Sequence, residues 1–368
     1  MNAATQQLTW CSRDAVAKIV GRPRSASGLL LVSVAPDVVT PLAPKEKDET
    51  LAITRETLAS FGLGDGDRVA IALNNDGDGT GGLLTEAAVD LAEAVANLGP
   101  RGRMRLRSAI ESLRANVLIT TASGAADFLA RLHMEFLADP LDLELRALVL
   151  VGEIADHETY RHLGREFDAE IIEVLNDPLT GAALAYRRPL SADGTWHVTR
   201  EDTVRLAPLE SDEILDFPPP AGRAEVVIHH PWHSKLSGAM VRSGYICEVP
   251  EGSTGIPAIS HTSGGHVLIR GRWVSLARIE SALKLIDGIT RVRLEIERQG
   301  TIDTATVHVT FGRATLVKNP MWRGRIAEAI YSVSPVEIGI EIDEVVQEVA
   351  VPFEVLDRRG HHLTDTRV

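Results

Sequence analysis

Helix-spaced apolar positions alternate with short apolar runs along the first half of the chain. Leu51, Leu58 and Phe61 recur near helical spacing, and Arg68 to Leu73 is a β-rich apolar run. The same alternation continues to residue 167. We expect strands at 68–73, 115–121 and 145–153, and helices at 50–61, 84–98, 106–113, 125–136 and 158–167. This order is typical of a largely parallel, doubly wound sheet.

The pattern changes twice further along the chain. After Pro178, short strands with Pro and Gly turns dominate 184–269, including a strand at 224–230. Beyond Gly271 we expect helices at 276–286 and 324–333 and strands at 292–298, 305–311 and 337–342. The sequence therefore predicts an α/β protein: a large doubly wound domain with a β-rich end (1–270) and a small C-terminal α+β domain (271–368).

Composition and charge narrow the function classes. Among 368 residues, 38 Lys and Arg face 51 Asp and Glu, which gives a net charge of −13, and only 4% are aromatic. An acidic chain with few aromatic side chains suits neither a phosphate backbone nor base stacking, so nucleic acid is not an expected partner. The basic segment with Arg101, Arg103, Arg105 and Arg107 indicates a solvated charged face.

Two cysteines, Cys11 and Cys247, are too few for a disulfide framework or for a zinc site of their own. The N-terminal segment has no apolar core of a signal peptide, and no apolar run approaches the roughly 18 residues of a membrane span. We therefore expect a cytoplasmic protein that contacts no membrane.

Four stretches, taken in order, resemble a known family. They are ETLASFGLGDGDRVAIAL, RSAIESLRANVLITTASGAADFLARL, LRALVLVGEIADHETYRHLGREFDAEIIEV and VLIRGRWVSLARIESAL. Their order and spacing resemble the phenylacetate-CoA ligase branch of the adenylate-forming (acyl-CoA synthetase) superfamily, from about Glu56 to the C-terminus. The resemblance implies a large domain that binds ATP and a carboxylate. It also implies a small C-terminal domain that rotates to exchange adenylation for thioester formation.

Adenylation requires groups that neutralise charge on the α-phosphate, and this chain lacks most of them. The stretch between Leu29 and Phe61 has no glycine, so the family's phosphate loop is missing there. A later glycine run at 76–82 carries aspartates that would repel phosphate, and no lysine follows it.

The other family motifs are changed as well. By the resemblance, Leu179 stands near the glutamate that helps to hold Mg²⁺, with Asp177 the nearest carboxylate, and Tyr245 replaces the ribose-binding aspartate. The hinge aligns with 262–265 and loses its arginine and both acids, and His361 replaces the catalytic lysine.

Some positions keep the family's residue types. Gly152 and Glu153 resemble its Gly-Ala-Glu motif near the adenine, and Thr120 to Ser123 resembles its Thr-Pro-Ser motif. A plainer interpretation is open: Gly152 ends a strand, and the hydroxyls bond the local backbone. The substrate-binding residues that we predict are Thr120, Thr121, Ser123, Gly152, Glu153, Arg242, His266 and His361.

Histidines are frequent where the family's charged residues are lost. Five of them occur between His229 and His266. Because histidine titrates near neutrality, we predict His229, His230 and His233 as candidate general acids or bases. Cys247 is a candidate nucleophile, against the alternative that it packs in the core. The spacing of His229 and His233 alone is too little to indicate zinc, and no metal site is predicted.

Three hypotheses follow. The first is a protein of small-molecule biosynthesis that binds an acyl or aryl carboxylate or its thioester and acts without ATP through histidine chemistry. The alternatives are an active ATP-dependent acyl- or aryl-CoA or carrier-protein ligase, and a non-catalytic scaffold partner. The lost motifs argue against ATP and Mg²⁺ and leave a CoA thioester open as a ligand. A carrier protein and a homodimer are left open as partners.

Overall fold

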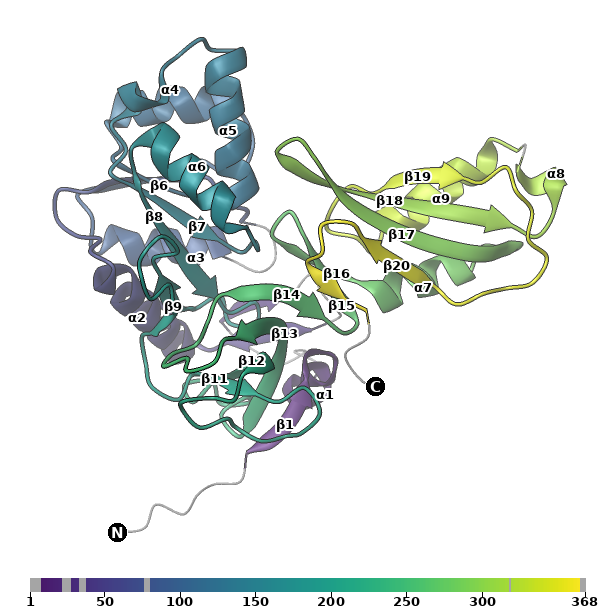
Figure 1. The fold of residues 1–368 in the computed structure, drawn as a ribbon, viewed down its shortest axis with the longest axis horizontal. Helices are drawn as coiled ribbons and strands as arrows, with labels where there is room; N and C mark the ends of the chain where they lie inside the picture. Colours follow the sequence, from purple (N-terminus) through teal and green to yellow (C-terminus); the bar gives the residue numbers. More distant parts are fainter. Residues whose placement is uncertain (1–7, 22–27, 33–37, 76–79, 318, 365–368) are drawn as a thin grey trace. The chain divides into compact units, whose positions relative to one another are not determined.

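The computed structural model describes residues 8–21, 28–32, 38–75, 80–317 and 319–364. They form two compact units, the first ending at Ser260 and the second beginning at His261 (Figure 1). This division comes before the expected boundary at Gly271, because the intervening residues form strands of the second unit. Thr262 pairs with His362, and His266 pairs with Ser275.

A seven-stranded sheet forms the centre of the first unit, in the order β10-β9-β8-β7-β6-β4-β5. Strands β5, β4, β6, β7 and β8 run parallel to one another. Strand β9 pairs antiparallel with β8, and β10 pairs antiparallel with β9. The doubly wound sheet predicted from the sequence is thereby confirmed. The strands are β4 (Arg68–Ile71), β5 (Ala94–Asn97), β6 (Val117–Thr120), β7 (Ala147–Val151), β8 (Glu170–Asn176), β9 (Ala183–Arg187) and β10 (His197–Val198).

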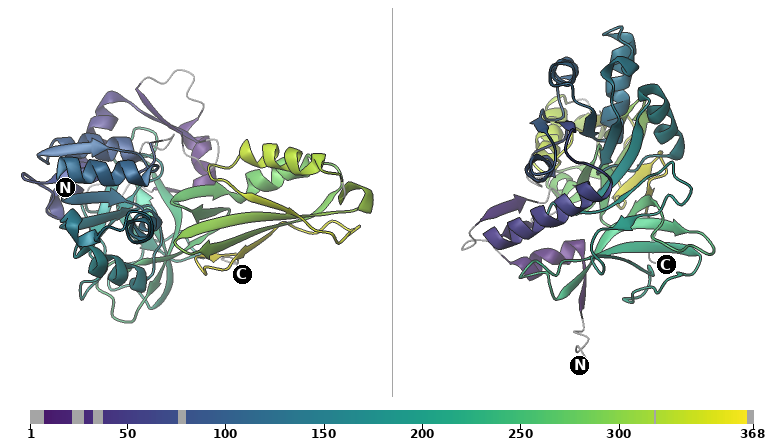
Figure 2. Two further views of the ribbon diagram at one scale, coloured as in Figure 1. Left: turned by 90° about the horizontal axis from the view of Figure 1, so that it is seen from above. Right: turned by 90° about the vertical axis from the view of Figure 1, so that its left-hand side faces the viewer.

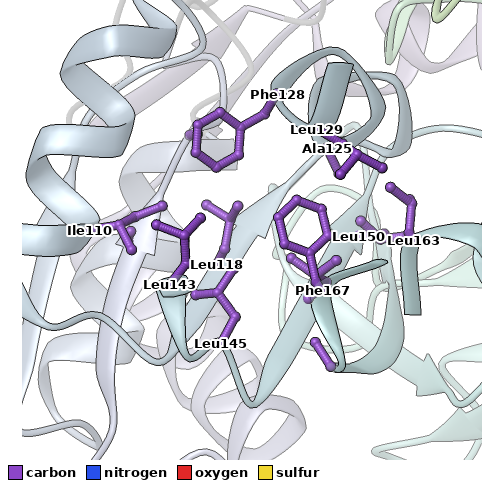
Figure 3. Close-up of a cluster of buried hydrophobic side chains, with 14 of the residues drawn as sticks. Ile110, Leu118, Ala125, Phe128, Leu129, Leu143, Leu145, Leu150, Leu163 and Phe167 are labelled. Atoms are coloured by element: carbon purple, nitrogen blue, oxygen red, sulfur yellow. The ribbon is translucent and has the colours of Figure 1, made fainter. Parts of the chain in front are cut away.

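Helices cover both faces of this sheet because the parallel strands are apolar on both sides. Leu106, Phe128 and Phe167 pack with one strand face, and Figure 3 shows part of this cluster. Leu58 and Leu84 pack with the other face. The first set comes from α4 (Arg103–Leu113), α5 (Ala122–Met134) and α6 (His157–Phe167), and the second from α2 (Pro44–Ser60) and α3 (Thr80–Val89).

One expected helix is wrong in its second half. The pattern predicts a helix over 84–98, but α3 ends at Val89 and β5 follows at Ala94. Strand β5 pairs in parallel with β4, with Ala94 opposite Arg68. Because the sheet offers unpaired backbone groups at its edge, strand pairing outweighs the local preference of this alanine-rich segment for a helix.

The rest of the first unit is β-rich, as expected for 184–260. Strand β12 pairs antiparallel with β11 and β13, and β1 joins β13 in parallel. These strands are β1 (Thr9–Ser12), β11 (Val204–Ala207), β12 (Gly222–His229) and β13 (Ala239–Val249), beside the hairpin β2 (Leu29–Val32) and β3 (Val39–Leu42). Short helices complete it: η1 (Arg13–Ala15), α1 (Val16–Val20) and η2 (Pro140–Leu143).

The second unit is an α+β sandwich, as predicted. Its four-stranded sheet has the order β19-β18-β17-β20, and Ile279, Leu283 and Ile326 pack on one face of it. Figure 2 shows the two long helices on the same side of the sheet. The elements are β14 (Ile259–Ser263), which starts in the first unit, β15 (His266–Ile269), β16 (Arg272–Ser275), α7 (Leu276–Lys284), β17 (Ile289–Gln299), β18 (Ile302–Phe311), α8 (Ala314–Val317), α9 (Met321–Tyr331), β19 (Gly339–Ile342), β20 (Glu354–Asp357) and β21 (His362–Leu363).

In the ranges that the structure describes, no helix is both long enough and apolar enough to span a bilayer.

The stacked pair of Phe128 and Phe167 gives a direct test of the first core. Phe128 is fully buried, and its ring centroid lies 6.3 Å from that of Phe167. Because truncation leaves a cavity, Phe128→Ala should lower the free energy of unfolding by about 3–5 kcal/mol in urea denaturation. Met134→Ala, at a position 76% exposed on the same helix, should change it by less than about 0.5 kcal/mol. Equal effects of the two substitutions would contradict this core.

Candidate functional site

The predicted binding residues of the first unit gather where its parallel strands end. Thr120 ends β6, Gly152 and Glu153 follow β7, and Asn176 ends β8. In doubly wound sheets, ligands bind at this carboxyl edge. Gly152 has a φ of +80°, which is the left-handed conformation that favours glycine, so it also ends the strand as the plainer interpretation holds.

Glu153 bonds the N-terminus of α5. Its Oε2 accepts from the Ser123 backbone N–H at 2.6 Å, and its Oε1 accepts from the Ser123 hydroxyl at 2.6 Å. Thr121 is the N-cap, and its Oγ1 accepts from the Gly124 N–H at 3.0 Å. A helix N-terminus attracts anions through its free N–H groups and its dipole. Here the anion is a side chain of the protein itself.

Thr120 points its hydroxyl along the sheet. The residue is buried, and its Oγ1 donates to the Ala72 carbonyl at 3.3 Å. The structure therefore brings Thr121, Ser123 and Glu153 together, as the sequence predicts, but these side chains bond one another and the local backbone.

A cavity of about 20 Å³ lies between this edge and the β-rich part of the first unit. Two polar atoms of its lining, Asn176 Oδ1 and Trp196 Nε1, are buried and have no hydrogen-bond partner among the described residues. Such a volume holds about one water molecule, which could bridge the indole N–H to the amide oxygen. A nucleoside cannot enter it. The remaining lining residues are Gly152, Glu153, Ile154, Glu173, Val174, Leu175, Tyr245 and Ile259.

A buried ion pair lies beside the cavity. Arg187 Nε donates to Glu173 Oε2 at 2.6 Å, and the Tyr160 hydroxyl donates to the same oxygen at 3.0 Å. Burial raises the pKa of Glu173, against the lowering by Arg187 and the Tyr160 hydroxyl. Glu173, Asn176 and Trp196 are residues of this site that the sequence did not predict. One feature of the sequence could have indicated Asn176: it directly precedes Asp177, the carboxylate nearest to the family's metal-binding position.

The three candidate catalytic histidines anchor one loop. His229 Nε2 bonds the Ser237 carbonyl at 2.9 Å, and His233 Nε2 bonds the Pro41 carbonyl at 3.1 Å. His230 is fully buried, and its Nε2 bonds Asp177 Oδ2 at 2.9 Å. None of the three lines the small cavity. Their role as general acids or bases stays a prediction, and in the first unit these imidazoles bond the loop after β12 to neighbouring elements.

Asp177 is likewise held by hydrogen bonds within the fold. Its carboxylate accepts from the Leu179 N–H at 3.2 Å and from the Thr180 N–H at 2.9 Å, besides its bond to His230. Burial raises the pKa of Asp177, but His230 and the hydrogen bonds outweigh it and lower the pKa to about 2. The carboxylate nearest to the family's metal-binding position is thus occupied by hydrogen bonds within the fold. Within the described residues, no three His, Cys, Asp or Glu side chains group to hold a metal ion.

Arg242 and Cys247 also have structural roles. Arg242 is buried. Its Nη1 donates to Glu225 Oε2 at 2.7 Å, and its Nη2 donates to Asp212 Oδ1 at 3.0 Å. The guanidinium also lies 5.2 Å from the centre of the Trp10 ring. These partners hold the guanidinium within the fold, and substrate binding by Arg242 stays a prediction. Burial raises the pKa of Cys247 to about 12, so the thiol is inert and not a nucleophile at neutral pH.

Two predicted residues, His266 and His361, belong to the second unit, so their placement with residues of the first unit stays a prediction. His266 is buried at the start of β15. The backbone carbonyl of His361 accepts from the Thr262 N–H at 2.7 Å, which ties the C-terminal segment to β14. The arginine face fits its prediction: Arg103 pairs with Asp127 at 2.6 Å and Arg107 with Glu111 at 2.8 Å. Of the glycine run at 76–82, residues 76–79 lie outside the described residues.

Comparison with solved structures settles the fold. A 2-hydroxyisobutyryl-CoA ligase with 2-HIB-AMP and CoA bound matches with a TM-score of 0.73 at 15% identity, over 92% of this chain and 76% of that chain. The fold is that of the adenylate-forming enzymes. A malonyl-CoA ligase with methylmalonyl-CoA and AMP bound gives 0.61 at 13%, over 88% and 70% of the two chains. The amide bond synthetase McbA from Marinactinospora thermotolerans gives 0.62 at 15%, over 88% and 65%.

No family model and no curated protein sequence matches the chain. The adenylate-forming fold is therefore shown, and the phenylacetate-CoA ligase branch stays a prediction. The two ligases named here carry AMP and CoA compounds in their structures.

The structural role of His230 can be tested by truncation. His230→Ala removes the partner of a buried carboxylate, Asp177, and should lower the free energy of unfolding by about 3 kcal/mol. His157→Ala, at an exposed position at the start of α6, should change it by less than about 0.5 kcal/mol. Urea denaturation at neutral pH measures both. A His230→Ala protein as stable as the wild type would refute the structural assignment.

His362 should make the second unit sensitive to acid. Burial and Arg359 lower the pKa of His362 to about 4, against the opposing effect of Asp357, and its Nδ1 lies 2.9 Å from Thr262 Oγ1. The unfolded histidine takes up its proton near pH 6.5, so the free energy of unfolding should fall as the pH drops from about 6.5 to 4, by about 3 kcal/mol in all.

His362→Gln removes this titration and keeps a neutral polar group. In urea denaturation at about pH 7 and about pH 4.5, the wild type should lose more stability than the variant. A variant that loses as much would show that His362 is not the titrating group.

Proposed function

We propose that this protein is a non-adenylating member of the adenylate-forming fold. It acts as a non-catalytic binding partner in the metabolism of an acyl or aryl carboxylate or its thioester. The fold supports the metabolic setting, because its structural neighbours are acyl-CoA ligases and an amide bond synthetase. The hydrogen bonds of Glu153 and the small cavity at the carboxyl edge of the sheet support the loss of adenylation.

The observation that carries the proposal is the carboxylate of Glu153 on the N-terminus of α5. A phosphate at this terminus would compete with Glu153 for the Ser123 N–H and would meet its negative charge. Next to it, the cavity of about 20 Å³ has no room for adenosine. The absence of a glycine loop between Leu29 and Phe61 removes the alternative cradle for phosphates.

Histidine catalysis is the weaker candidate on the same geometry. Each of His229, His230 and His233 is bonded within the fold, and burial lowers the pKa of His233, so that it stays neutral at physiological pH. General acid–base catalysis needs a group within hydrogen-bond reach of a substrate. A binding function needs none of these groups.

Titration calorimetry with Mg·ATP and with a panel of acyl- and aryl-CoA compounds tests the proposal. We expect no heat of binding with either, and no pyrophosphate release when carboxylates and Mg·ATP are added together, because the edge is closed. ATP binding in the micromolar range with pyrophosphate release would contradict the loss of adenylation. Heat with an acyl-CoA alone would contradict the expected absence of a thioester site and favour a nucleotide-free thioester site.

A further inference from the structure

The second unit contains a groove of about 730 Å³, open to solvent, within the size range of ligand sites. Phe353, Glu354 and Val355 line one part of it, and Gly264, His362 and Thr364 line another. The first set belongs to β20 and the residue before it, and the second surrounds β21. The remaining lining residues are Leu276, Arg291, Gln347, Val351 and Pro352.

Both strands at this groove are edge strands. In the sheets formed by the described residues, β20 pairs with β17 alone and β21 pairs with β14 alone. An edge strand presents a row of unpaired N–H and C=O groups, which an extended chain can satisfy by adding as a further strand. A groove lined by two such edges is suited to a polypeptide in extended conformation.

The segment that leads into β20 carries exposed apolar side chains. Val345 and Val349 are each 73% exposed, and Val351, which lines the groove, is 39% exposed. Gathered over a few residues, these valines are a surface that a partner would cover.

The charged residues near the groove indicate the sign of the partner's charge. No lysine or arginine occurs from residue 326 to residue 357. The one arginine of the lining, Arg291, is neutralised by Glu354 at 2.9 Å. Glu344 and Glu348 are exposed and form no ion pair within the described part of the chain. These unpaired acids belong to the segment that leads into the groove, whose lining includes their neighbours Gln347 and Val351, and they favour a basic ligand.

We infer that the groove between β20 and β21 binds an extended, basic and apolar segment of a partner protein, which adds as a strand to β20. Its alternate side chains point to opposite faces of the added strand, so its apolar set faces Phe353 and Val351 in the groove, and its basic set is attracted by the acids of the segment that leads into β20. This inference rests on the proposed function, because it names the chemistry of the binding partner.

A synthetic, fluorescently labelled peptide of about ten alternating lysines and valines is the probe, and anisotropy with the full chain is the measurement. We expect saturable binding that weakens with salt. The double variant Glu344→Lys with Glu348→Lys should weaken it at least about tenfold, because it reverses the exposed charge. Glu337→Lys is the control, since Glu337 is an exposed acid that precedes β19 and lies outside the segment leading into β20, and it should leave binding within about twofold.

A second peptide with alternate backbone nitrogens methylated tests the strand addition itself. Methylation removes N–H donors and leaves charge and side chains in place, so it should abolish binding. The inference is overturned if the unmodified peptide does not bind, if the methylated peptide binds equally well, or if the double variant binds as tightly as the control. The nucleotide and acyl-CoA titrations test the sheet edge of the first unit and not this groove. A peptide that does not bind would therefore overturn the inference about the groove and leave the proposed function unaffected. ATP binding would overturn the proposed loss of adenylation and leave the peptide result unaffected.

Discussion

The parallel arrangement of five strands is the constraint on which the first unit depends. Since parallel strands end together, Thr120, Gly152 and Asn176 come to one edge, and the N-terminus of α5 opens onto the same place. In this fold such an edge is an anion site by construction. At this edge Glu153, which resembles a residue of the family's motif near the adenine, accepts from the Ser123 N–H and hydroxyl.

The same edge explains why the buried polar residues nearby are structural. Asp177 follows directly on β8 and is buried, and His230 supplies the partner that a buried carboxylate needs. Glu173 inside β8 has Arg187 and Tyr160 for the same reason. The histidines in the gap between lost motifs therefore bond the loop after β12 to its neighbours, and their role as acids or bases stays a prediction.

Periodicity predicted most of the fold because the elements are strongly patterned. The strands with Val117, Leu148 and Ile171 are apolar on both faces, which only a covered parallel sheet produces. The edge strand β5 and the short β20 and β21 were missed, since their stability comes from pairing and not from their own pattern. At the site, Ser123 and Glu153 were found through the family resemblance. Trp196 was not, because only the folded chain brings its loop to the end of β8.

We propose that the chain's own side chains fill the carboxyl edge of the sheet in the first unit. A crystal structure of the full chain grown with Mg·ATP in excess is the sharpest test. We expect Glu153 to stay on Ser123 and one ordered water to lie between Trp196 Nε1 and Asn176 Oδ1. A nucleotide at the carboxyl ends of β6 and β7, with Glu153 displaced from α5, would contradict it.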